Sequence, residues 1–250
     1  MYYINHQAPH SWGFLFVECW VDLGMIRYLS LLIFIGLVWG QDSPNPQRFN
    51  KNPEGDNVSI DLFRLWDKKN STPKYPVVFV GSSSIRKWST AEYFPDIPIV
   101  NRGFGGSHIS DVNHFINETV LKHNPRVIIF YAGDNDINYG KSPKIVLKDY
   151  IYFVDQIHSQ LPETEIIFIP IKPSLKRWAL WNEMKEANRL VRNYSKKKPL
   201  LYYIDTASPM LNSNGLPKSS LFVSDSLHLS KDGYDLWSKI LEPVLRDVLE

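Results

Sequence analysis

The stretch PVVFVGSSS, residues 76–84, decides the fold. Pro76 precedes four consecutive apolar residues, 77–80, and Gly81 ends the run. A short apolar run that is rich in β-branched residues and bounded by turn residues is typical of a strand buried on both faces of a sheet. Three serines follow the glycine. The stretch therefore predicts a buried strand whose carboxyl end carries polar side chains.

The same pattern recurs four times along the chain. The further apolar runs are residues 97–100, 127–131, 166–169 and 201–204. The helical stretches are residues 109–121, 145–161, 181–194 and 231–249, with one more before the first strand that Asn57 or Ser59 caps. Strands that alternate with helices form a parallel sheet covered on both faces. We therefore expect an α/β fold, a three-layer α/β/α sandwich around a five-stranded parallel sheet.

Length and composition place the chain among ordinary globular proteins. It has 250 residues, 44% of them hydrophobic, and a formal net charge of +2. A chain of this length holds one domain, or two at most. The basic residues are scattered apart from residues 196–198, so we expect no nucleic-acid partner. Cys19 is the only cysteine, which excludes an intrachain disulfide.

The first forty residues predict a targeting segment. Arg27 precedes the apolar run YLSLLIFIGLV, residues 28–38, and Gly40 follows shortly after. This is the layout of a cleavable signal peptide, residues 25–40, and the run is shorter than the ~18 residues that a spanning helix needs. We therefore expect a secreted or periplasmic protein without a stable membrane anchor.

Residues 1–24 fit no signal layout, because charges interrupt their apolar stretch. Our hypothesis is that translation starts at Met25; the alternative is an N-terminal helix that packs on the domain. Residues 41–56 are rich in Pro, Asn and Asp and predict a linker. The folded domain is then expected to cover residues 57–250.

Polar residues at the strand ends are the first candidates for chemistry, because ligands of parallel α/β sheets bind there. A serine in the turn after Gly81 presents its hydroxyl beside backbone N–H groups, although Ser and Gly also form ordinary turns. The glycines of residues 103–106 allow a backbone to approach a ligand closely, but their spacing does not match a dinucleotide site.

A third cluster, residues 133–136, follows the run 127–131. Asn135 offers a side-chain amide of the kind that an oxyanion hole uses. Asp134 and Asp136 are expected to cap a helix or a turn, because no neighbouring histidine or third carboxylate completes a metal site. We therefore predict neither a metal nor a cofactor.

Asp225 and His228 form the most informative pair. A carboxylate holds the tautomer of an imidazole and stabilises the imidazolium that forms when it takes a proton from a serine. The alternative is a capping aspartate beside a surface histidine. The other histidines of the domain, in predicted helices or beside the glycine turn, are weaker candidates for a base: His108, His114, His123 and His158.

In this order, the clusters resemble the SGNH or GDSL-type hydrolase family of serine esterases. The resemblance covers about residues 75–245 and rests on residues 81–83, 101–106 and 133–136 and on the pair Asp225 and His228. Ser82 stands where the family has the aspartate of its GDSL name, and that aspartate is not a member of the family's triad. The chain looks most similar to bacterial esterases akin to platelet-activating-factor acetylhydrolase catalytic subunits, and also to carbohydrate deacetylases.

The resemblance implies a flavodoxin-like fold and hydrolysis of an acyl ester without a cofactor. It implies that Ser83 attacks the carbonyl, that His228 transfers the proton and that Asp225 orients His228. The oxyanion hole that it implies consists of the backbone N–H groups of Ser83 and Gly106 and the amide of Asn135.

The sequence gives weaker guidance on the substrate. No wide apolar lid is visible, which favours a short acyl chain such as acetyl, and export fits an O-acetylated polysaccharide. The candidate substrate contacts are Phe104, Tyr131, Arg177 and Trp178. Trp178 and Trp181 also fit ordinary packing. The alternatives are a lysophospholipase or thioesterase, and a non-catalytic glycan-binding protein on the same fold.

Overall fold

The structure of the protein is a computed structural model that describes residues 43–50 and 59–250. These residues belong to one of the two units into which the chain divides, residues 39–250. The predicted upstream extension, residues 1–24, and the predicted signal peptide, residues 25–40, lie outside the described residues. No helix within the described ranges is long and apolar enough to cross a membrane.

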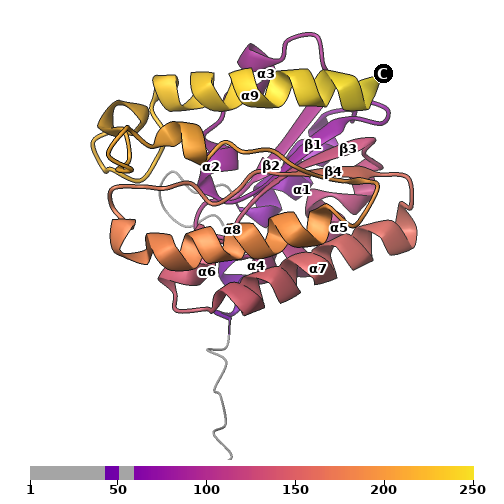
Figure 1. Ribbon diagram of the computed structural model, residues 1–250. Coiled ribbons are helices and arrows are strands. Elements are labelled where there is room, and N and C mark those ends of the chain that lie inside the picture. The colour runs from indigo at the N-terminus through magenta and orange to yellow at the C-terminus, as the bar shows by residue number, and fades with distance from the viewer. Residues whose placement is uncertain (1–42, 51–58) are drawn as a thin grey trace, which may run out of the picture. The chain divides into compact units, whose positions relative to one another are not determined.

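Five parallel strands form one sheet in the order β2-β1-β3-β4-β5 (Figure 1). They are β1 (Val77–Gly81), β2 (Ile99–Gly103), β3 (Val127–Tyr131), β4 (Glu165–Phe168) and β5 (Leu201–Tyr203). The predicted sheet is confirmed. The strand order reverses direction between β1 and β3, and open α/β sheets bind their ligands at such a switch point.

Helices cover both faces of the sheet, which confirms the three-layer sandwich (Figure 1). One face carries α2 (Ser83–Arg86), α3 (Thr90–Tyr93) and α9 (Lys231–Leu249). The other carries α1 (Ile60–Lys69), α4 (Ile109–His114), α5 (Ile116–Thr119), α7 (Pro143–Gln160) and α8 (Trp181–Ser195). The short helix α6 (Asp134–Asn138) follows β3. The 3₁₀ turns are η1 (Pro46–Phe49), η2 (Leu121–His123), η3 (Trp178–Leu180), η4 (Ser208–Met210) and η5 (Ser219–Leu221).

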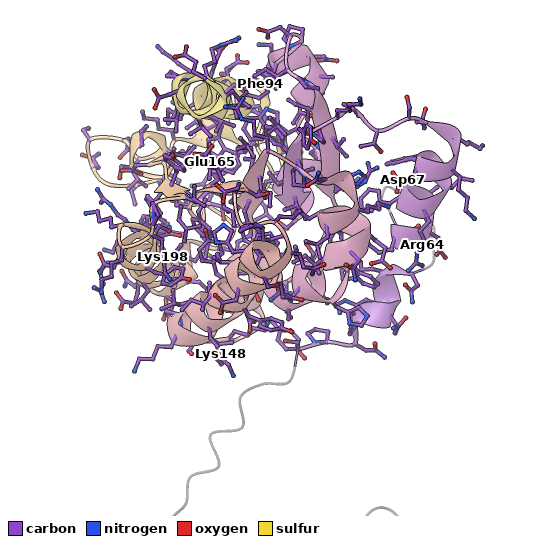
Figure 2. All side chains as sticks on the ribbon, turned by 90° about the vertical axis from the view of Figure 1, so that its right-hand side faces the viewer. Arg64, Asp67, Phe94, Lys148, Glu165 and Lys198 are labelled. Carbon is purple, nitrogen blue, oxygen red and sulfur yellow. The ribbon has the colours of Figure 1, made fainter. Side chains whose placement is uncertain are left out.

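The continuous apolar strands fill two cores at once. Val78 and Val80 of β1 belong to the core under α4, α7 and α8, whereas Val77 and Phe79 belong to the core under α9. Figure 2 shows Phe94, a member of this second core, beside α9. Successive strand residues point to opposite faces, so both must be apolar when both faces are covered.

The helix predicted over residues 109–121 is broken into α4, α5 and η2. The break falls at Phe115, which leaves helical geometry at φ −102° and ψ 25°. Its ring is buried and packs edge-on against Phe104, with the ring centroids 6.3 Å apart. The regular helical hydrogen bonds are interrupted where this aromatic side chain is buried. The spacing of apolar residues along the sequence does not show such a break, because tertiary packing overrides helical propensity.

Part of the predicted linker packs on the domain. Residues 46–49 form η1, and buried Phe49 lies edge-on to Phe104 with the ring centroids 5.0 Å apart. Arg48 forms an ion pair with the buried carboxylate of Asp111 at 2.5 Å. One aromatic ring and one cation anchor this segment, although its overall composition is typical of a linker.

Buried His123, at the end of η2, is expected to make the protein sensitive to acid. Among the described residues neither ring nitrogen has a hydrogen-bond partner. Burial, reinforced by Arg102, lowers the pKa of His123 from 6.5 to about 4. A group whose pKa falls on folding stabilises the native state at pH values above its pKa in the unfolded state. This contribution to stability is lost as the pH falls through the pKa of the group in the folded state.

The free energy of unfolding should therefore decrease from pH 6.5 towards pH 4, by up to about 1.4 kcal/mol per pH unit from this group. Urea unfolding of His123→Leu across this range should show a flatter pH dependence than the wild type. The matched control is His114→Gln, because His114 is exposed. Equal pH dependence in wild type and His123→Leu would contradict the prediction.

Candidate active site

The strand register brings the predicted polar clusters to one edge of the sheet. Gly81, the last residue of β1, pairs with Gly103 of β2 and with Tyr131 of β3. The segments that follow these three strands therefore begin at the same level, beside the switch point. Gly81 has φ 137°, and a Cβ there would lie 1.8 Å from the carbonyl oxygen of Tyr131, so only glycine fits.

Of the three adjacent serines, Ser83 is the one that faces His228. Ser82 and Ser84 are both buried. The hydroxyl of Ser84 accepts a hydrogen bond from Lys172 at 3.0 Å. Ser83 is the first residue of α2 and is only partly buried, and its Oγ lies 3.0 Å from Nε2 of His228.

Asp225 lies on the opposite side of the His228 ring. Its Oδ2 is 2.5 Å from Nδ1 of His228. An ionised carboxylate can only accept, so Nδ1 carries the proton and Nε2 is left to accept from the Ser83 hydroxyl. Burial alone would raise the pKa of Asp225, but hydrogen bonds from His228 and from the backbone outweigh it and lower the pKa to about 2.

The loop that carries Asp225 and His228 is held at several points. Backbone N–H groups of Leu227 and His228 donate to Oδ1 of Asp225 at 2.8 and 2.9 Å. Ser226 turns the chain in the left-handed region at φ 60°, and its carbonyl accepts from the N–H of Lys176 at 3.0 Å. The loop is thus fixed both internally and against the segment after β4.

Asn135, in the first turn of α6, is oriented by two neighbours. Its Nδ2 donates to the carbonyl of Ser107 at 3.0 Å, and its Oδ1 accepts from Nη2 of Arg177 at 2.9 Å. An amide nitrogen has two hydrogens, so one remains available to a ligand. Within the described chain, no backbone hydrogen bond uses the N–H of Ser83 or of Gly106. These donors are therefore available to bind an anion.

Asp134 accepts the backbone N–H of Asn135 in the first turn of α6 at 3.0 Å, in line with the predicted capping or turn role, and it also belongs to a buried ionic cluster. Its Oδ2 lies 3.3 Å from Nζ of Lys172 and 3.1 Å from Nη1 of Arg177. Burial alone would raise the pKa of Asp134, but the two cations outweigh it and lower the pKa. The Lys172 ammonium also donates to the hydroxyl of Tyr131 at 2.9 Å.

Asp136 is a buried ion-pair partner that also accepts a backbone N–H at the start of a helix, in line with its predicted capping role. It lies 2.8 Å from Nζ of Lys141 and accepts the backbone N–H of Ile109 at 3.2 Å. This carboxylate therefore links α6 to the start of α4. Lys141 follows Asp136 by five residues. Sequence spacing of this kind does not predict an ion pair.

Two of the four predicted substrate contacts lie in the cores. Phe104 and Tyr131 are both 0% exposed, so the prediction that they contact substrate is wrong. Tyr131 is the last residue of β3, and its place in a continuous apolar run already indicated a strand buried on both faces. Arg177 and Trp178 are partly buried, and Arg177 contacts Asn135.

Sequence reasoning missed Lys172 as a member of this site. The sequence did indicate this position, because Lys172 closely follows the apolar residues 166–169 and therefore lies at the carboxyl end of a strand. Within residues 43–50 and 59–250, no group of three or more His, Cys, Asp or Glu residues could hold a metal ion. The arrangement combines a hydroxyl, an oriented imidazole and N–H groups without a backbone partner, which suits acyl transfer.

We expect a fluorophosphonate probe to label Ser83, since its hydroxyl is the one paired with the imidazole. Mass spectrometry of the labelled protein should place the probe on the peptide containing residue 83, and Ser83→Ala should abolish labelling. The matched control is Ser82→Ala, which removes a buried hydroxyl next to it and should keep labelling. Loss of labelling in Ser82→Ala with full labelling of Ser83→Ala would refute this assignment.

Comparison with known proteins agrees with this chemistry. Three solved structures share the fold. A Streptococcus pneumoniae protein named as a candidate platelet activating factor has a TM-score of 0.68 at 21% identity, covering 74% of this chain and 90% of its own. A Clostridium thermocellum family 3 carbohydrate esterase has a TM-score of 0.56 at 18% identity, with coverages of 70% and 99%. A catalytic mutant of an acetylxylan esterase from Geobacillus stearothermophilus has a TM-score of 0.57 at 15% identity, with coverages of 71% and 96%. A search of curated proteins finds no relative of the chain.

The sequence match is to a protein-family model and spans residues 81–236, more than half of the chain. The matched stretch begins at Gly81 and ends within α9, so it includes Ser83, Asp225 and His228. With that match and with the shared α/β/α architecture, the chain belongs to the GDSL-like lipase and acylhydrolase family and is a carboxylic ester hydrolase.

Proposed function

We propose that the protein is an exported serine esterase that removes short acyl groups, in particular acetyl groups, from carbohydrate. The observation that carries the proposal is the hydrogen-bonded series from the Ser83 hydroxyl through His228 to Asp225, with distances of 3.0 and 2.5 Å. Nucleophile, base and orienting group lie within hydrogen-bond reach of one another, as covalent catalysis requires.

The first half of the reaction acylates the enzyme. Oγ of Ser83 attacks the ester carbonyl carbon while Nε2 of His228 takes the hydroxyl proton, and ionised Asp225 stabilises the resulting imidazolium. The tetrahedral intermediate collapses when His228 gives that proton to the leaving alcohol oxygen. The acyl group stays on Ser83 as an ester. Water then attacks this ester with His228 as base, which releases the acid and restores the hydroxyl.

The negative oxygen of the intermediate is bound by Asn135 and by the free backbone N–H groups of Ser83 and Gly106. Arg177 acts on this oxygen through Asn135. Its guanidinium donates to the amide oxygen at 2.9 Å, which fixes the amide with its nitrogen towards the site. A cation on the amide oxygen also makes the amide N–H a stronger donor. Arg177 is thus a positioning residue.

Several observations support a carbohydrate ester as the substrate. Two of the structurally similar proteins are a carbohydrate esterase and an acetylxylan esterase. The apolar run of residues 28–38 supports export, which would bring the enzyme to extracellular glycans. The paired Ser83 and His228 argue against the rival in which the fold binds glycans without catalysis. A lysophospholipase or thioesterase is separable by its preference for acyl length.

The acyl-length preference is the direct test of the proposed function. With p-nitrophenyl esters of increasing chain length, kcat/KM should be highest for acetate and fall steadily as the chain grows. Acetylated xylan should release acetate, and Ser83→Ala should release none. An optimum at long acyl chains would favour the lysophospholipase alternative, and an inactive wild type would favour the non-catalytic one.

Substitutions in the oxyanion hole should lower turnover rather than substrate binding. Asn135→Ala removes a donor that is needed only in the transition state and should reduce kcat by about 10²- to 10³-fold. Arg177→Met leaves the donor in place but unpolarised, so we expect a smaller loss of about tenfold in kcat with little change in KM.

Arg177→Lys should recover part of the Arg177→Met loss, because it restores a cation near the amide. The control is Arg64→Met, which removes another ion-paired arginine on the surface of α1 (Figure 2). Steady-state kinetics and the melting temperature of each variant should be measured together. A rise in KM at constant kcat for Arg177→Met would contradict the positioning role.

A further inference from the structure

A groove of about 770 Å³ lies beside the segment that follows β4. Its walls come from η3, from one side of α8 between Trp181 and Arg192, and from Tyr203 at the end of β5 with residues that follow it. Its lining residues include Trp178, Trp181, Asn182, Arg192 and Asp205. None of them takes part in the proposed reaction steps.

One wall of the groove belongs to the segment that holds the oxyanion donor and the loop of the base. Trp178 directly follows Arg177, whose guanidinium is 2.9 Å from Oδ1 of Asn135. Lys176, one residue earlier, donates its backbone N–H to Ser226 in the loop that carries His228. Trp178 is therefore one residue from the side chain that contacts the oxyanion donor and two residues from a backbone contact with the loop of the base. A substrate bound at Ser83 can therefore extend into the groove.

Two stacked tryptophans line the groove. The rings of Trp178 and Trp181 are nearly parallel, with an angle of 15° between planes and 6.0 Å between centroids. Both side chains are only partly buried. Sugar rings present apolar C–H faces and a rim of hydroxyls, and a flat indole with an N–H at its edge matches both features.

The rest of the groove is polar and carries both signs of charge. Asn182 is exposed on the wall, and Asp205 and Arg192 supply an acceptor and a donor. Glu186 and Arg189 neutralise each other in an ion pair at 2.6 Å. A long acyl chain would need a continuous apolar surface, whereas hydroxyl groups can use donors and acceptors of either kind. The composition therefore favours a neutral sugar chain over a lipid tail.

We propose that this groove is a binding subsite for the sugar rings that neighbour the acylated ring of an oligosaccharide substrate. The inference rests on the proposed function, because it takes Ser83 as the residue that receives the acyl group. It assigns Trp178 and Trp181 as the surface on which the sugar rings stack, and it makes the enzyme selective for polymeric acetyl sugars over small acetyl esters.

The test compares two substrates in each variant. We expect Trp178→Ala to lower the ratio of kcat/KM on acetylated xylan to kcat/KM on p-nitrophenyl acetate by about tenfold. Trp178→Phe, which keeps an aromatic ring, should retain most of the ratio. The matched control is Trp66→Ala, because Trp66 is also a surface tryptophan, 38% exposed on α1, and should leave the ratio unchanged.

A binding measurement separates this inference from the proposed function. Calorimetric titration of Ser83→Ala with acetylated xylo-, manno- and chito-oligosaccharides should detect binding that Trp178→Ala weakens about tenfold. If the wild type hydrolyses no ester but shows this binding, the proposed function fails and the subsite stands. If the wild type hydrolyses p-nitrophenyl acetate but neither the ratio nor binding of any of these sugars depends on Trp178, the subsite is refuted.

Discussion

The buried ion pair between Lys172 and Asp134 joins the strand ends on which the site is built. Lys172 follows β4 and Asp134 follows β3, and the same ammonium group contacts the hydroxyl of Ser84, next to Ser83 after β1. Removing an ammonium group from water costs several kcal/mol unless its hydrogen bonds are satisfied. Here three oxygens lie around it, from Asp134, Ser84 and Tyr131. The cluster is therefore stable only when the three strand ends are in register.

The two halves of the site depend on the fold in different ways. The oxyanion half is tied to the buried cluster, because Arg177 contacts both Asp134 and Asn135. The base half lies on a loop before α9, and the side chain of Asp225 is 46% exposed. The hydrogen bond between Ser83 and His228 joins residues 145 positions apart. Packing of α9 holds these halves together, since Tyr234 donates to the carbonyl of Ser84 at 2.9 Å.

The sequence predicted the sheet, and it predicted which polar side chains gather at its edge, because both leave local signals. Continuous apolar runs mark strands buried on two faces, and polar residues directly after them mark the edge where Ser83, Asn135 and His228 meet. Partners that meet only through the fold were not predictable. The ion pairs of Asp134 with Lys172 and of Asp136 with Lys141, and the anchoring of η1 through Phe49, depend on which surfaces come together. The burial of Tyr131 could have been predicted, because this residue belongs to a continuous apolar run.

We propose that the ester passes its acyl group to Ser83. Rapid quenching of the enzyme with p-nitrophenyl acetate, followed by proteolysis and mass spectrometry, tests whether this residue is acylated. We predict an acetyl group on the peptide that contains residue 83, formed within the first turnover and lost at the steady-state rate. Turnover at the full rate with no acetylated residue, or with the acetyl group on a different side chain, would contradict the account.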